Sequence, residues 1–212
     1  MKKSLIVSID SWKNGEPIPS KYAFGQIPKT GHFELGGNIS PSISWENAPE
    51  ETKSFVIICH DPDVPSVGDD VNQEGKIVPS DLPRVNFYHW VLADIPVHIT
   101  SLSEGEASTG VTAKGKASGK KAYGLAGLNS YTQWFEGDVD MGGNYADYDG
   151  PCPPWNDSII HHYHFTVYAL DKVSLELNEI FDANDVIKAM EGHILTKDSW
   201  VGTYSMNPKV QK

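Results

Sequence analysis

Two short segments of the sequence combine carboxylate, imidazole and phenol side chains that could form one polar site. The first is Asp61-Pro62-Asp63, which directly follows an apolar run, and the second is the histidine-rich run 161–165. Proline at position 62 favours an extended backbone at Asp61, so its carboxylate is expected on a rigid turn at a strand end. Such a carboxylate could serve a binding site, or it could simply close an Asx turn.

The run Gly150–Asp171 joins a proline-rich turn to a predicted strand, and successive strand side chains point to opposite faces. His161 and Tyr163 therefore share one face, whereas His162 and His164 share the other. Three histidines in four positions exceed what a buried strand needs, so one face is expected to meet something other than core. For His162 and His164 we favour a solvent-exposed face, which antiparallel sheets often have.

The elements that must position these residues are mostly strands. Runs rich in β-branched and aromatic residues recur between turn-forming residues, which predicts a mainly β protein. The clearest are Leu5–Ile9, Ser54–His60, Phe87–Ile95, Ile159–Leu170 and Trp200–Met206. One helix is predicted, with Asp182 as its N-cap and apolar residues at helical spacing as far as Ile194. The connections Val64–Asn86 and Ala107–Gly150 are unusually long, and we expect parts of both to frame a pocket.

Composition restricts the class of protein. The 212 residues, 39% hydrophobic and 10% aromatic, suit a single globular domain over residues 1–212. A formal charge of −11 and the lack of a basic run argue against nucleic acid and anionic membrane surfaces as partners. No apolar stretch is long enough to span a membrane and no export signal is recognisable, so a cytoplasmic location is expected. Cys59 and Cys152 are expected to be free buried thiols, and no cofactor or metal is predicted.

Several motifs together resemble the phosphatidylethanolamine-binding protein family, also called the Raf kinase inhibitor protein family, and specifically its bacterial branch. The first family motif is D-P-D-x-P followed downstream by H-W, and it matches Asp61–Pro65 and His89-Trp90. The second is G-P-x-P-P, then H-x-Y-x-F and Y-A-L, and it matches Gly150–Pro154, His161–Phe165 and Tyr168–Leu170. The similarity extends from about Leu35 to about Tyr204.

The resemblance implies a two-sheet antiparallel β-sandwich with a late C-terminal helix and a small anion pocket near one end. The positions that it assigns to ligand binding are Asp61, Asp63, His89, Pro154, His161 and Tyr163. It implies noncatalytic binding of a small phosphorylated or other anionic ligand, with modulation of a protein partner as a further expectation. His162 stands where the family often has arginine, and the long segments 64–86 and 134–149 could cover the pocket mouth. Kinase inhibition belongs to particular eukaryotic members of the family and does not carry over.

In such a pocket, imidazole and phenol groups would donate hydrogen bonds to the anion, and a nearby carboxylate would favour the protonated imidazole. We therefore expect affinity for phosphate-like ligands to rise as the pH falls from about 8 toward about 6, near the ordinary histidine pKa.

Two other functions stay open at this point. The same Asp61, His89 and His161 could form the acid/base or metal set of a hydrolytic enzyme, although no nucleophile motif such as G-x-S-x-G is present. His162 and His164 could ligate a metal, but the sequence names no third ligand. The chain could also be an interaction protein that uses its sheet surface and not the pocket. Monomer and homodimer are not distinguished.

Overall fold

The structure is a computed structural model that describes residues 4–210. Its strands are β1 (Ile6–Ser8), β2 (Gly25–Gln26), β3 (Glu34–Leu35), β4 (Ile43–Glu46), β5 (Ser54–Pro65), β6 (Arg84–Pro96), β7 (Ser101–Leu102), β8 (Gly119–Lys121), β9 (Gly124–Ala126), β10 (His161–Leu170) and β11 (Ile194–Tyr204). The α-helices are α1 (Tyr131–Trp134) and α2 (Ala183–Ala189), and a 3-10 helix covers Ser20–Tyr22.

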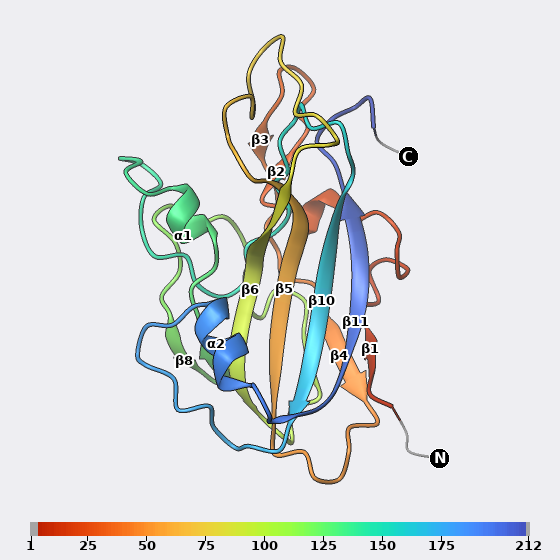
Figure 1. The fold of residues 1–212 in the computed structure, drawn as a ribbon, viewed down its shortest axis with the longest axis vertical. Helices are drawn as coiled ribbons and strands as arrows, with labels where there is room; N and C mark the ends of the chain where they lie inside the picture. The colour runs from red at the N-terminus through yellow and green to blue at the C-terminus, as the bar shows by residue number, and fades with distance from the viewer. Residues whose placement is uncertain (1–3, 211–212) are drawn as a thin grey trace.

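Antiparallel sheets build the molecule (Figure 1). The main sheet has the strand order β11-β10-β5-β6-β9-β8, a smaller sheet has the order β1-β4-β7, and β2 pairs with β3. In Figure 1, β1 and β4 lie behind the main sheet and α2 lies in front of it. The sheets thus form the predicted sandwich, with a short late helix on the outer face of the larger sheet.

Alternation along β10 divides the core into two layers. Tyr163 and Phe165 are fully buried and pack between the sheets, in the same cluster as Trp45 of β4. The opposite face of the main sheet packs against α2, where Val56 and Val186 share a second cluster. Burying each such side chain contributes about 1.5–3 kcal/mol, so the alternation sets the strand register.

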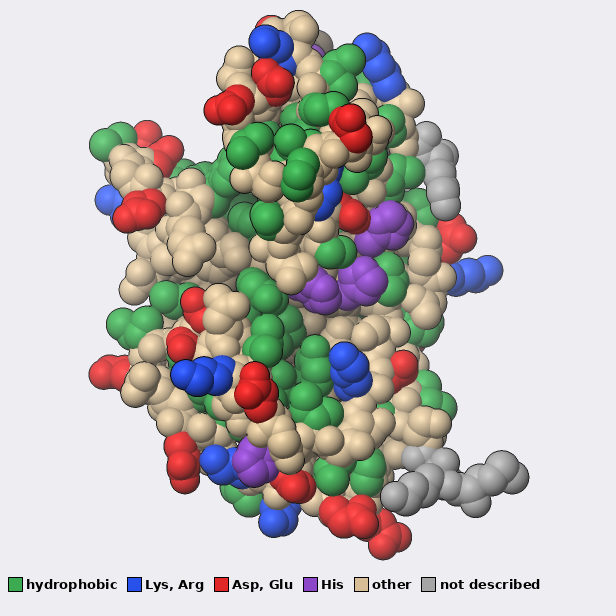
Figure 2. Space-filling model, viewed as in Figure 1, with side chains coloured by type: hydrophobic (Ala, Val, Ile, Leu, Met, Phe, Trp, Pro, Cys, Tyr) green, Lys and Arg blue, Asp and Glu red, His purple; other side chains and the backbone are tan. Residues whose placement is uncertain are grey.

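The outer face of β10 is accessible to solvent near the N-terminal end of the strand. His162 is exposed and His164 is half-buried, as predicted. His60 of β5 is the cross-strand partner of His164, and the two rings stack with centroids 5.2 Å apart. Figure 2 shows a group of histidines in the middle of this face, below a region where hydrophobic side chains gather.

Strand β5 continues past the predicted end at His60, so the prediction that Asp61 lies on a turn was wrong. The pairing of β5 with β6 shifts register near Cys59 and again between Asp61 and Val64. A bulge accommodates Pro62, which has no N–H to give to the ladder, so the strand bends and does not end.

The late helix begins as predicted but ends early. The Asp182 side chain accepts from the N–H groups of Asn184 and Asp185 in a capping box. Gly192, with a φ of +78°, then turns the chain, and Ile194 begins β11 instead of extending the helix. The connection 107–150 is likewise not a plain loop, because β8, β9 and α1 form within it.

Two other expectations concern thiols and location. Cys59 and Cys152 are both free thiols; Cys59 is buried and Cys152 half-buried. Within residues 4–210, no helix is long and apolar enough to cross a membrane. The cytoplasmic location stays a prediction.

Candidate functional site

A cavity of about 320 Å³ opens beside the ends of β5 and β6, under α1 and the proline turn 151–154. Its walls are largely aromatic: Phe24, Phe33, Phe87, Tyr131, Trp134 and Phe135. Asp61, His89 and Tyr163 also line it, and because each is at most 3% exposed we call them the polar floor. The rim contains Phe33, Val67 and Trp134, which are about half exposed at 50%, 51% and 55%. The cavity thus joins an apolar mouth to a buried polar end.

Four of the six predicted ligand-binding residues line this cavity. They are Asp61, His89, Pro154 and Tyr163. Asp63 and His161 do not line it, and both form hydrogen bonds with Asp61. Both long connections contribute to the walls, as expected, through residues 64–72 and 131–135.

His89 is anchored by the backbone of the proline turn. Its Nδ1 lies 2.9 Å from the carbonyl oxygen of Asp149 and 3.1 Å from that of Gly150, so Nδ1 carries the proton and donates. Burial lowers the pKa of His89 to about 4. At neutral pH its Nε2 is therefore an unprotonated acceptor.

His161 lies between two carboxylates. Its Nδ1 is 2.7 Å from Oδ2 of Asp61, and its Nε2 is 3.1 Å from Oδ2 of Asp157. Because both partners are acceptors, both ring nitrogens carry hydrogen and the ring is an imidazolium. Burial alone would lower the pKa of His161, but the hydrogen bonds to Asp157 and Asp61 raise it to about 9.

Arg84 completes this arrangement, giving a row of alternating charges that we call the charge chain: Arg84, Asp157, His161 and Asp61. Arg84 donates to both carboxylate oxygens of Asp157, at 2.6 and 3.1 Å. Burial would raise the pKa of Asp157, but hydrogen bonds from His161 and Arg84 outweigh it and lower that pKa. The buried carboxylate of Asp61 is thereby balanced by the His161 imidazolium.

Asp63 supports the strand bulge. Its N–H donates to Oδ1 of Asp61 at 2.8 Å, and its carboxylate accepts from the backbone and ring of His162 at 2.9 and 2.8 Å. Asp63 thus orients Asp61 and joins β5 to β10, which fits a structural role for this part of the motif.

The hydroxyl of Tyr163 is the polar group of the floor that bears most directly on ligand binding. Its side chain is fully buried, and among the described residues its hydroxyl makes no well-formed hydrogen bond, although the Asp61 carboxylate lies close enough to interact with it. Burial, together with the negative charge of Asp61, raises its pKa well above the ordinary value, so it stays protonated. It is a hydrogen-bond donor at the cavity floor, and the acceptor beside it, Asp61, makes no well-formed hydrogen bond with it.

The pKa values of the two histidines change the expected pH dependence. His89 changes charge near pH 4 and His161 near pH 9, so neither titrates between about pH 6 and 8. The predicted rise in anion affinity over that interval cannot come from these histidines.

The structure bears on two groups that a hydrolase would use, while Nε2 of His89 stays available as an acceptor. Burial raises the pKa of the Cys152 thiol to about 12, so it is a poor nucleophile at neutral pH. Both ring nitrogens of His161 are occupied by carboxylates, which leaves no nitrogen to accept a proton. Across residues 4–210, no group of three or more histidine, cysteine or acidic side chains is arranged to hold a metal ion.

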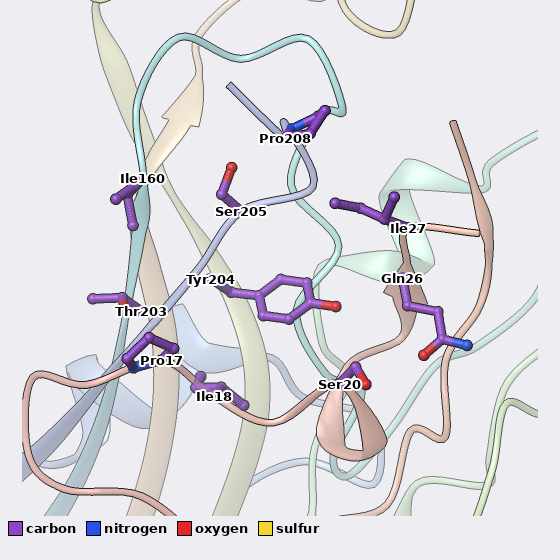
Figure 3. Close-up of a pocket in the computed structure, with 10 residues that line it drawn as sticks. All are labelled: Pro17, Ile18, Ser20, Gln26, Ile27, Ile160, Thr203, Tyr204, Ser205 and Pro208. Atoms are coloured by element: carbon purple, nitrogen blue, oxygen red, sulfur yellow. The ribbon is translucent and has the colours of Figure 1, made fainter. Parts of the chain in front are cut away.

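A second and more open pocket, of about 450 Å³, lies beside the end of β11 (Figure 3). It is lined by Pro17, Ile18, Ser20, Gln26, Ile27, Ile160, Thr203, Tyr204, Ser205 and Pro208. Tyr204 points across it and donates to the carbonyl oxygen of Gly25 at 3.1 Å. The predicted ligand-binding residues do not line this pocket.

Sequence reasoning missed part of the site. Phe24 and Phe33 belong to the β2–β3 region and carry no motif, although both line the cavity. Arg84 begins β6 and Asp157 lies in the connection before β10, and their importance emerges only from the contacts of Asp157 with His161 and with Arg84. An acidic residue four positions before a buried histidine was the available signal for Asp157.

Comparison with known proteins places the chain in a family. A sequence model described as phosphatidylethanolamine-binding protein matches residues 8–205. The chain belongs to the phosphatidylethanolamine-binding protein family. This membership confirms the resemblance carried by the two motifs, and the fold agrees with the mainly β class that they implied.

Relatives of this phosphatidylethanolamine-binding protein family member occur in archaea and bacteria. A UPF0098 protein of Methanothermobacter thermautotrophicus is 35% identical over 180 residues, covering 85% of this chain and 91% of that protein. A UPF0098 protein of Aquifex aeolicus is 34% identical over 194 residues, covering 92% and 84%.

Solved structures of two bacterial proteins have the same fold. Escherichia coli YbcL, described as a new member of the mammalian PEBP family, gives a TM-score of 0.67 at 25% identity, covering 96% of this chain and 99% of that one. A PEBP homologue from Chlamydia trachomatis gives 0.63 at 27% identity, covering 95% and 97%. These similarities extend over nearly the whole chain.

Proposed function

We propose that this protein binds, without chemical conversion, a small ligand that carries a phosphate or other anionic group. The phosphatidylethanolamine-binding protein family is a family of ligand-binding proteins, and the chain belongs to it. The anionic group would lie on the polar floor, and the organic part of the ligand would contact the aromatic walls. A protein partner modulated by this ligand would meet the apolar rim around Phe33 and Trp134.

One observation carries the proposal: Tyr163 lines the cavity, and among the described residues its buried hydroxyl makes no well-formed hydrogen bond, with Asp61 beside it. Leaving a buried polar group unpaired costs about 1–3 kcal/mol. An unpaired polar group in a binding site is therefore expected to form a hydrogen bond with a bound ligand. A phosphoryl oxygen accepts strongly from a phenol. Because Asp61 is paired with His161, its repulsion of an anion is reduced.

Replacing Tyr163 by phenylalanine tests this role. Wild-type protein is expected to bind phenyl phosphate in a calorimetric titration, and Tyr163→Phe to bind it roughly tenfold or more weakly, because one hydrogen bond to a charged group is lost. Tyr168→Phe, on the outer face of the same strand, is the matched control and should bind like wild type. The proposal fails if phenyl phosphate does not bind, or if the cation benzylamine binds in its place.

A further inference from the structure

We infer that a third pocket, which we call the amide pocket, binds the ring of a neutral sugar. The amide pocket has a volume of about 330 Å³ and lies between β6, α1 and the beginning of α2. Among the described residues it shares no lining residue with the aromatic cavity that contains the polar floor, so the inference does not rest on the proposed function.

The amide pocket lies on the opposite side of β6 and α1 from the aromatic cavity. Phe87 of β6 lines the cavity, whereas its neighbours Asn86 and Tyr88 line the amide pocket, as alternation along a strand requires. In α1, Trp134 lines the cavity and Gln133 lines the amide pocket. Figure 1 shows α1 and α2 one above the other beside β6. The same elements therefore present two chemically different surfaces.

Hydrogen bonds join the walls of the amide pocket to one another. The N–H of Ser130 donates to the carbonyl oxygen of Tyr88, and the N–H of Tyr88 donates to Oγ of Ser130, both at 2.9 Å. The N–H of Leu128 donates to the carbonyl oxygen of Phe181, next to α2, at 2.8 Å. Asn129 is 3% exposed, and its amide donates to two aspartate residues. The pocket is thus preformed, which lowers the entropic cost of binding.

Several polar groups of this frame have no partner. The side-chain carboxamides of Asn86, Gln133 and Asn184 form no hydrogen bond with any described residue. Oδ1 of Asp182 accepts from the N–H groups of Asn184 and Asp185, so the backbone at the start of α2 is already satisfied. Its Oδ2 accepts no hydrogen bond from a described residue. Side chains, and not the helix end, therefore supply the groups that a ligand would meet.

These groups match hydroxyls better than ions. A carboxamide both donates and accepts, and so does a hydroxyl, so three carboxamides and a carboxylate oxygen suit a ring that carries several hydroxyls. Among the described lining residues, none is a lysine, arginine or histidine, and only Asp182 is charged. A phosphate or carboxylate would therefore find no cation in this pocket and would be repelled by Asp182.

The remaining walls and the size of the amide pocket favour a single ring. Tyr88 and Leu128 are half-buried and line it, and their apolar surfaces can pack against the C–H groups of a sugar. A volume of about 330 Å³ is near the lower end of the range for ligand pockets. The ring is the same whether the sugar is free or ends a glycan.

NMR of the side-chain NH₂ groups in ¹⁵N-labelled protein tests the inference. D-glucose, D-galactose, D-mannose and their methyl glycosides are titrated separately to millimolar concentrations. We expect at least one sugar to shift the signals of Asn86, Gln133 and Asn184 saturably while the ring signals of His89 stay unchanged. Binding of the methyl glycoside alone would identify the ring as the end of a glycan, and binding of both forms would show that a free sugar suffices.

The double variant Asn86→Ala/Gln133→Ala removes two of the three free carboxamides. Both positions are exposed and neither side chain is bonded to a described residue, so the fold should be retained. We expect the variant to bind the sugar at least about tenfold more weakly than wild type, because it lacks two sets of hydrogen bonds. Asn178→Ala removes an exposed carboxamide outside the pocket and should bind like wild type.

Three results would overturn the inference: no sugar shifts the three carboxamide signals, the double variant binds as tightly as wild type, or inorganic phosphate or methylammonium shifts these signals in place of the sugars. Each of them would leave the proposed function standing, because the two pockets share no lining residue among those described. A sugar that shifts the His89 signals and not the carboxamides would also contradict the inference, since it would bind in the aromatic cavity.

Discussion

Replacing His161 by alanine will lower the free energy of unfolding by about 3–5 kcal/mol near neutral pH. The imidazolium pairs with Asp61 and Asp157, both 1% exposed, and its removal leaves two buried carboxylates without their shared partner. Arg84 still binds Asp157, so the larger cost falls on Asp61. Denaturant unfolding of wild type and variant measures the difference.

The pH dependence gives this prediction a second signature. The pKa of His161 is raised from 6.5 to about 9, so its stabilisation is fully present below about pH 6.5 and is lost as the pH rises through 9. At 1.4 kcal/mol per pKa unit this amounts to about 3 kcal/mol. His161→Ala should lack this loss, whereas His162→Ala, at a half-exposed ion pair, should retain it and change stability by less than about 1 kcal/mol. A wild-type stability that is flat between about pH 7 and 10 would contradict the imidazolium assignment.

Gly150→Ala is expected to disrupt both stability and binding. A Cβ at this position would overlap the carbonyl oxygen of Tyr22, and backbone cannot move aside cheaply. Overpacking of this kind costs typically 1–3 kcal/mol or more. The carbonyl of Gly150 also accepts from His89 and Tyr131, so a displaced turn would move two residues of the cavity.

We therefore expect Gly150→Ala to lower the melting temperature by several degrees and to weaken phenyl phosphate binding at least about tenfold. Gly68→Ala is the matched control. Gly68 also lines the cavity, but a Cβ there meets nothing within 4 Å. Similar losses in both variants would show that the close approach of Gly150 to Tyr22 does not support the floor.

Local sequence patterns predict which side chains share a face of a strand, but not how distant strands bring side chains together. Strand alternation correctly separated His161 and Tyr163 from His162, because the two faces of a strand differ by a fixed period. It could not show that His161 lies behind Asp61 and outside the cavity, since that depends on how β5 bends at its bulge.

Long-range contacts account for what the sequence did not predict. Arg84 and Asp157 are 73 positions apart, and their ion pair depends on the packing of two irregular connections. Phe24 and Phe33 reach the cavity from near the N-terminus through the β2–β3 hairpin. The early end of α2 reflects competition from β11, whose pairing with β10 includes Ile194.

Histidine side-chain NMR during a phenyl phosphate titration tests the central claim most directly, because it reports where the ligand lies. The account predicts that the ring signals of His89 shift progressively and saturate with the binding curve, while those of His162 and His193 stay unchanged. Saturable binding that leaves the His89 signals in place, or that moves those of His162, would place the ligand away from the polar floor and contradict the account.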